Sequence, residues 1–185
     1  LTARHEGALL RLAWPISTGE AGSLTLNLDA GQPLIESLGA TKAGQAAPAL
    51  IQRVNPVILL TVGERDLQNP AGWVAFFDNP PLRAYRTFAM AIDKQTVRVA
   101  SEGARTVVTV GNVTAGSFKG VFQFTLFRQS ALIFAEAVVQ TAENGRAILY
   151  DAGLLSGGVP SWRNAAWLDT AGTLQRSAVD VNQVA

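Results

Sequence analysis

The feature that most constrains this chain is an alternation of apolar and polar residues that recurs along almost its whole length. Leu24, Leu26 and Leu28 alternate with Thr25 and Asn27, a spacing that places every second side chain on one face of a β-strand. Comparable runs occupy residues 8–14, 34–38, 57–62, 73–77, 85–92, 96–100, 106–110, 120–128, 132–141 and 147–150. The pattern therefore predicts a chain built of β-strands.

Residues suited to tight turns stand between these runs. They include Asp29-Ala30-Gly31, Asn79-Pro80-Pro81, Glu102-Gly103-Ala104 and Glu143-Asn144-Gly145, which tolerate the backbone angles that turns require. Asn144-Gly145 is the strongest local signal for a hairpin. Gln129-Ser130 is expected to join residues 120–128 and 131–141 as two adjacent strands.

Helix is expected to be minor. Residues 44–54 are the one stretch that suggests a helix, and Pro48 limits it to one or two turns. Strands joined by short turns, without intervening helices, predict an all-β fold. We favour a two-sheet antiparallel β-sandwich over a closed barrel.

The domain organisation follows from one change in composition. Residues 156–161 read Ser-Gly-Gly-Val-Pro-Ser, which is typical of a hinge. We expect residues 1–155 to form the sandwich, and residues 156–185 to form the hinge and a tryptophan-containing tail that packs on it.

Composition excludes several classes of function. The chain has 185 residues, of which 48% are hydrophobic and 16% charged, so it can form an ample core and is not disordered. A formal net charge of +1 gives no basic patch for nucleic acid. There is no cysteine, and the single histidine is His5, so we expect no disulfide, no thiol chemistry, no metal site and no cofactor. No apolar run reaches the ~18 residues of a membrane-spanning helix.

Catalytic candidates are limited to carboxylates, because no nucleophile elbow, Walker loop or dinucleotide fingerprint occurs. Glu136 stands among apolar residues, so it is expected to pair with an arginine such as Arg128, to face solvent or to line a cleft. Asp151 is expected either to cap a turn after Tyr150 or to point into a rim. Glu136 and Asp151 are the candidate acid and base if the chain contributes to glycoside chemistry.

Aromatic residues with polar neighbours suggest where a sugar could bind. The tail carries Trp162, Arg163, Asn164 and Trp167, which would provide flat apolar faces and hydrogen-bond donors. The alternative is that the two tryptophans plug one end of the sandwich. A second group, Arg83, Tyr85 and Arg86, is suited to a sugar or a carboxylate, or forms an exposed strand face. Trp14 and Trp73 lie in strand patterns and are expected in the core.

Long strand runs in the second half of the chain, residues 118–128, 132–141 and 147–154, resemble the large β-sandwich of the galactose-mutarotase-like superfamily. Residues 146–154, Arg-Ala-Ile-Leu-Tyr-Asp-Ala-Gly-Leu, and residues 55–66 also resemble a module of large exported bacterial proteins. The resemblance covers residues 20–155 and implies a sugar-binding domain. Mutarotase activity itself requires a histidine acid, and His5 is the only histidine, so no catalytic residue is carried over.

Three functional hypotheses follow. The first is a non-catalytic carbohydrate-recognition or scaffold module of a larger, exported bacterial sugar-processing protein. The second is a fragment of a carboxylate-dependent glycoside hydrolase or polysaccharide lyase. The third is a structural protein-interaction domain, which the low charge would suit because a neighbouring domain or protein partner would cover apolar surface.

Overall fold

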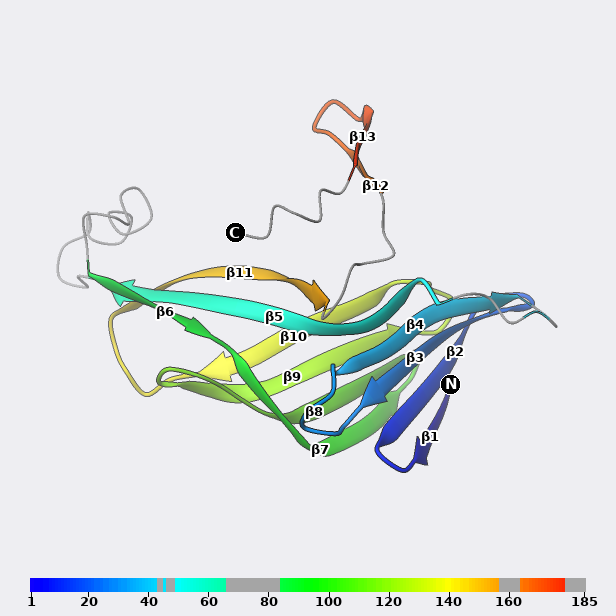
Figure 1. The fold of residues 1–185 in the computed structure, drawn as a ribbon, viewed down its shortest axis with the longest axis horizontal. Coiled ribbons are helices and arrows are strands. Elements are labelled where there is room, and N and C mark those ends of the chain that lie inside the picture. The colour runs from blue at the N-terminus through cyan, green and yellow to red at the C-terminus, as the bar shows by residue number, and fades with distance from the viewer. Residues whose placement is uncertain (43–44, 46–48, 66–83, 157–163, 179–185) are drawn as a thin grey trace. The chain divides into compact units, whose positions relative to one another are not determined.

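All regular structure in the described residues is β-strand, and no helix occurs among them (Figure 1). The structure is a computed structural model that describes residues 1–42, 45, 49–65, 84–156 and 164–178. Its strands are β1 (Thr2–Glu6), β2 (Leu9–Ser17), β3 (Glu20–Asn27), β4 (Ile35–Lys42), β5 (Ile51–Glu64), β6 (Tyr85–Ala89), β7 (Ala91–Glu102), β8 (Arg105–Ala115), β9 (Phe118–Phe127), β10 (Ile133–Gln140), β11 (Arg146–Ser156), β12 (Asn164–Leu168) and β13 (Leu174–Ala178).

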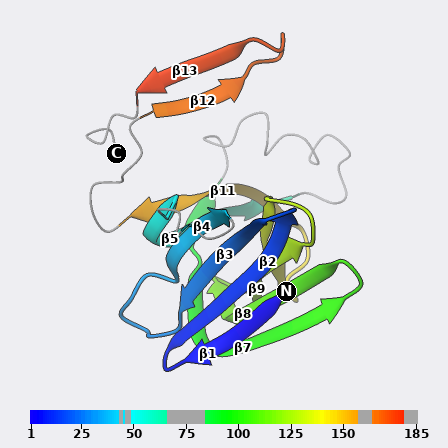
Figure 2. The same cartoon turned by 90° about the vertical axis from the view of Figure 1, so that its right-hand side faces the viewer.

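Two antiparallel sheets form the sandwich, as the alternation predicts. The larger sheet has seven strands in the order β1-β2-β3-β4-β5-β11, with β6 pairing beside β5. The smaller sheet has four strands in the order β10-β9-β8-β7. Figure 2 shows the same strands from the side, with β1, β2 and β3 near β7, β8 and β9. The expected pairing of residues 120–128 with 131–141 is confirmed as β9 with β10.

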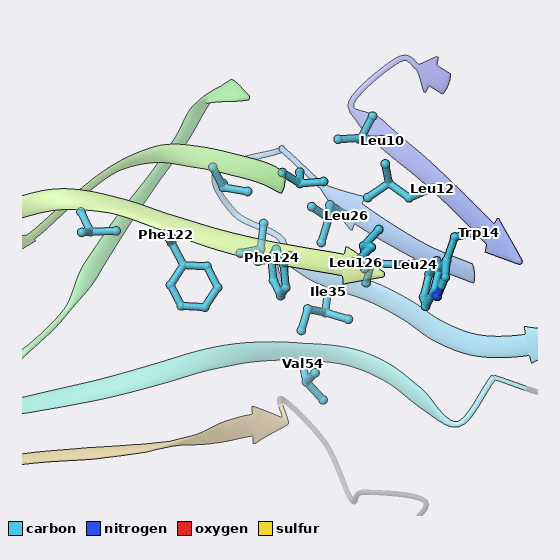
Figure 3. Packing of buried hydrophobic residues seen from close by; sticks show 14 residues of the cluster. Leu10, Leu12, Trp14, Leu24, Leu26, Ile35, Val54, Phe122, Phe124 and Leu126 are labelled. Atoms are coloured by element: carbon cyan, nitrogen blue, oxygen red, sulfur yellow. The ribbon is translucent and has the colours of Figure 1, made fainter. Parts of the chain in front are cut away.

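The core lies between the two sheets and is built from every second residue of their strands (Figure 3). Strand β2 buries Leu10, Leu12 and Trp14. From the opposite sheet, β9 buries Phe122, Phe124 and Leu126. Each such side chain stabilises the fold by roughly 1.5–3 kcal/mol when fully buried. The alternation of apolar and polar residues along the strands therefore gives each sheet one buried face.

Trp14 is a core residue, as expected, and is 2% exposed. Its Nε1 donates a hydrogen bond to the carbonyl oxygen of Ser130 at 2.8 Å, which satisfies the polar end of the buried ring. Gly22 lies opposite Trp14 on β3, and a Cβ there would stand 2.4 Å from the indole ring. The indole therefore occupies the space that a side chain at position 22 would need.

The chain passes from the larger to the smaller sheet at Met90. The alternation predicts one strand over residues 85–92, but the structure divides it there, since β6 pairs with β5 and β7 pairs with β8. The Met90 amide donates to the carbonyl of Ile58 at 2.8 Å. An apolar run can continue through such a crossing because its side chains remain in contact with the core.

The predicted hairpin at Asn144-Gly145 is wrong. Strand β10 belongs to the smaller sheet, whereas β11 lies beside β5 in the larger one. The turn therefore carries the chain between sheets. Gly145 has a φ of 66°, as a tight turn requires, but its carbonyl accepts a hydrogen bond from the Arg65 amide at 2.7 Å. Contacts to β5 thus decide where β11 lies.

The predicted helical stretch over residues 44–54 is also wrong where it is described. Ile51 begins β5, and Val54 pairs with Ile35 of β4. Val54 is 2% exposed in the main core. Burial of such β-branched side chains stabilises a strand here more than the weak helical spacing of apolar residues stabilises a helix. The alternation does not predict strand β1, because all its residues are exposed and its sequence lacks apolar alternation.

The chain divides into two compact units, residues 1–155 and 156–185. Within the second unit, β12 and β13 form an antiparallel hairpin that was not predicted. The Asp169 carboxylate closes its turn by accepting hydrogen bonds from the Ala171 and Thr173 amides, each at 2.9 Å.

Candidate functional site

A pocket of about 490 Å³ opens at one end of the sandwich and brings together charged side chains from several elements. Its lining residues come from the end of β5, the start of β6, the turn between β8 and β9 and the turn that leads into β11. Figure 1 shows where these elements run in the fold. Its polar lining includes Glu64, Tyr85, Arg86, Ser117, Glu143 and Arg146. Tyr85 and Arg86 are two of the residues that the sequence singled out.

Arg146 organises the charges of this pocket. Its Nε donates to Oε2 of Glu143 at 2.7 Å, and its Nη1 contacts Oε1 of Glu64 at 3.3 Å. The Arg146 side chain is 29% exposed, so its guanidinium is partly shielded from water. Because Glu64 ends β5 and Glu143 lies in the turn before β11, the two contacts hold the turn against the neighbouring strand.

The floor of the pocket is apolar. Phe88, on β6, packs against a small cluster that contains Leu60, Ala115 and Phe118. Gly116 has a φ of 59°, and a Cβ there would lie 2.9 Å from the Phe88 ring. The turn between β8 and β9 can therefore approach the ring closely only with glycine at this position.

Tyr85 and Arg86 project from opposite faces of β6. Arg86 pairs with Val62 and shares its face with Phe88, which packs inward. Tyr85 pairs with Gly63 and shares its face with Thr87, whose hydroxyl lies 3.0 Å from that of Thr61. Tyr85 is 50% exposed. Among the described residues, no acidic side chain forms an ion pair with Arg86.

The arrangement can bind a polar ligand. Guanidinium and hydroxyl groups supply donors, carboxylates supply acceptors, and the Phe88 ring supplies an apolar surface. The pocket's four charged side chains balance, since two are arginines, Arg86 and Arg146, and two are glutamates, Glu64 and Glu143. This chemistry matches hydroxyl-rich molecules, which need both donors and acceptors within reach of an apolar face.

The sequence does not identify the three members of the ion-pair network, Glu64, Glu143 and Arg146, as site residues. Glu143 and Arg146 flank the Asn144-Gly145 turn at a spacing of three, a signal that could have suggested an ion pair. Glu64 joins them from 82 residues away, and that contact depends on the order of strands in the sheet. Local sequence patterns therefore do not predict this contact.

The two candidate carboxylates lie elsewhere. Glu136 is partly buried on β10, opposite Gln123 of β9, and pairs with neither Arg128 nor any other cation of the described residues. Asp151 is exposed in the middle of β11, so the expectation that it caps a turn after Tyr150 is wrong. Neither residue lines this pocket.

The tail candidates are only partly within the described residues. Trp162 and Arg163 lie outside them, as do Arg83 and the predicted core residue Trp73. In the hairpin, Trp167 pairs with Gln175 and Asn164 with Ala178. Because Asn164 and Trp167 are three positions apart on one strand, they project from opposite faces. Trp167 is 49% exposed.

Two other hollows carry fewer charged side chains than this pocket. One of about 810 Å³ is lined largely by apolar and small residues, with Glu20 and Lys42 as its charged side chains. The other, about 560 Å³, borders Arg128 and Gln129. In the Glu20 hollow, the carboxylate already accepts from the Ser17 hydroxyl at 2.7 Å. We therefore take the pocket around Arg146 as the candidate site.

Within the described part of the chain, no group of three or more histidine, cysteine, aspartate or glutamate side chains is placed to hold a metal ion. The same residues include no helix that is long and apolar enough to cross a membrane.

Comparison of the sequence with protein-family models finds no family that matches, and comparison with curated proteins finds no similar sequence.

Proposed function

We propose that this chain is a non-catalytic carbohydrate-recognition module, and that the pocket around Arg146 holds the sugar. The observation that carries the proposal is the combination of the Arg146 guanidinium, held by Glu64 and Glu143, with Arg86 and the Phe88 ring in one pocket of about 490 Å³. Groups held in place before binding lose little entropy when a ligand arrives.

The positions of the carboxylates support a non-catalytic role. Glycoside hydrolysis needs two carboxylates that flank the scissile bond. In this pocket both carboxylates contact a single guanidinium, which suits a structural and binding role. Glu136 and Asp151, the alternative pair, come from strands of different sheets. A carboxylate-dependent hydrolase or lyase fragment therefore has less support than a binding module.

We also propose that the module is part of a larger protein. The resemblance of residues 20–155 to the galactose-mutarotase-like superfamily supports a place in a larger, exported bacterial sugar-processing protein. The two-sheet antiparallel architecture is compatible with that resemblance.

A second candidate is a protein-interaction domain, and one observation favours it. Large apolar side chains are exposed on two strands, β10 and β11. They are Phe134 and Val138 on β10, and Leu149, Tyr150, Leu154 and Leu155 on β11. Several exposed apolar residues along one strand are typical of surfaces that a partner covers.

A glycan array tests the first proposal. We expect the wild-type chain to bind at least one glycan, and Arg86→Ala to weaken that binding at least tenfold, because a hydrogen bond to a charged donor contributes roughly 1.5–3 kcal/mol. Lys119→Ala, a change at an exposed lysine outside the pocket, is the matched control. Failure to bind any glycan would leave the interaction domain as the better supported function.

A further inference from the structure

The outermost strands are β1 and β11 in the larger sheet and β7 and β10 in the smaller one, and charged residues make up a larger share of β1 and β7 than of β10 and β11. Strand β1 carries Arg4, His5 and Glu6, and β7 carries several charged residues and an irregular register between Asp93 and Val97. Charged side chains and bulges protect sheet edges from pairing with other chains. Strand β11, by contrast, has Asp151 as its only charged residue after Arg146.

Strand β11 is also exposed over most of its length. Every residue from Leu149 to Leu155 is exposed, and the exposed fractions of Tyr150 and Leu155 are 73% and 54%. Within the described residues β11 is the last strand of its sheet, with β5 as its one neighbour. Its other edge can accept a further strand.

We propose that β11 pairs in antiparallel fashion with β11 of a second copy of this chain, in a register centred on Ala152. This register places Leu149 opposite Leu155, Tyr150 opposite Leu154 and Asp151 opposite Gly153. Each of these large apolar residues then lies opposite another one, and the Asp151 carboxylate lies beside a glycine, which has no side chain. The two seven-stranded sheets become one continuous sheet.

Neighbouring symmetric registers are less favourable. Centring the pair on Asp151 would place two carboxylates directly opposite each other, which is destabilising. Centring it on Gly153 would place Asp151 opposite Leu155 and Tyr150 opposite Ser156. The register centred on Ala152 therefore combines the most apolar cross-strand pairs with no opposition of like charges, which is the argument for a second copy.

The absence of cysteine from the chain permits a direct test of this register by single-cysteine cross-linking. Residues opposite each other in an antiparallel pair have Cα atoms about 4.5–5.5 Å apart, within the range that a disulfide spans. Under mild oxidation Ala152→Cys should yield a covalent dimer. In Tyr150→Cys the two cysteines would be offset by four residues, roughly 13 Å, so this matched variant should stay uncross-linked.

A mixture of Tyr150→Cys and Leu154→Cys should restore the cross-link, because these positions face each other in the proposed register. Sedimentation velocity should show a concentration-dependent dimer for the wild type, and Leu154→Lys should raise its dissociation constant about tenfold by placing a charge on the edge. A wild type that stays monomeric at about 1 mM would overturn the proposal. So would a dimer in which position 152 fails to cross-link, or in which position 150 links to itself.

Discussion

The ammonium of Lys94 on β7 donates a hydrogen bond to the carbonyl oxygen of Asn27 at the end of β3, at 3.1 Å. It also donates to the carbonyls of Asp29 and Gln32 in the loop that follows. Lys94 is 8% exposed. One buried lysine thus ties the loop of the larger sheet to the edge strand of the smaller one.

We predict that Lys94→Met destabilises the fold by about 1–3 kcal/mol, because it leaves carbonyl groups without their donor in a shielded site. Urea unfolding monitored by circular dichroism measures this change. Lys119→Met, at an exposed position on β9, is the control and should shift the free energy of unfolding by less than about 0.5 kcal/mol. Equal effects of the two substitutions would show that the loop does not depend on Lys94.

A pH dependence of stability follows from the same lysine. Burial lowers the pKa of the Lys94 ammonium below its usual 10.5, and the Asp29 carboxylate opposes this in part. Between the lowered pKa and the usual one, the unfolded chain binds more protons than the folded chain. The free energy of unfolding therefore gains a term that rises with pH across that window.

Unfolding of the wild type and Lys94→Met at several pH values isolates this term. The stability of the wild type minus that of the variant should increase as the pH rises toward about 10.5, where the unfolded lysine also loses its proton. A difference that falls over the same range would contradict the assigned direction.

Gly22→Ala should destabilise the protein by about 1–3 kcal/mol, because the added methyl group would overlap the Trp14 ring in a packed core. Thermal unfolding with near-ultraviolet circular dichroism would report both the lower melting temperature and the disturbed indole. Gly31→Ala is a suitable comparison, since a Cβ at that position meets nothing within 4 Å. We expect that change to be close to neutral.

The hairpin of β12 and β13 should loosen in acid. Hydrogen bonds from the Gln175 side chain and then from the Thr173 amide hold the pKa of Asp169 below its usual 3.8. A carboxyl with a lowered pKa stabilises the folded turn above its usual pKa, and this contribution disappears as the pH falls through the lowered value.

Amide chemical shifts of Ala171 and Thr173, followed by NMR from neutral pH downward, would detect this loss. Asp169→Ala should give the shifted positions already at neutral pH. Asp151→Ala, at an exposed carboxylate on β11, should leave both amides unchanged. Amides that do not respond to acid would show that the carboxylate does not hold the turn.

The strands could be predicted because burial of one face imposes a local period, as in Leu10, Leu12 and Trp14. Strand β1 could not, since its exposed residues carry no such period. The neighbours of β11 were also beyond local reasoning: Asn144-Gly145 has the chemistry of a hairpin, but contacts to Glu64 and Arg65 direct the chain to the other sheet.

The candidate site, like the fold, could be predicted from the sequence only in part. Tyr85 and Arg86 stood out by composition, and the structure places both at the pocket. Arg146 did not, because its importance comes from two carboxylates that reach it from separate elements. The sequence favours the tail for sugar binding, with Trp162 as the stacking residue beside Arg163 and Asn164, so the two locations make different predictions.

NMR titration of the full chain with a glycan that binds on the array tests whether the pocket around Arg146 is the recognition site. We predict that the largest amide shift changes fall on Tyr85, Arg86, Ser117 and Arg146. Changes concentrated instead on Asn164 to Leu168 would place the sugar on the tail and show that the pocket is not the recognition site.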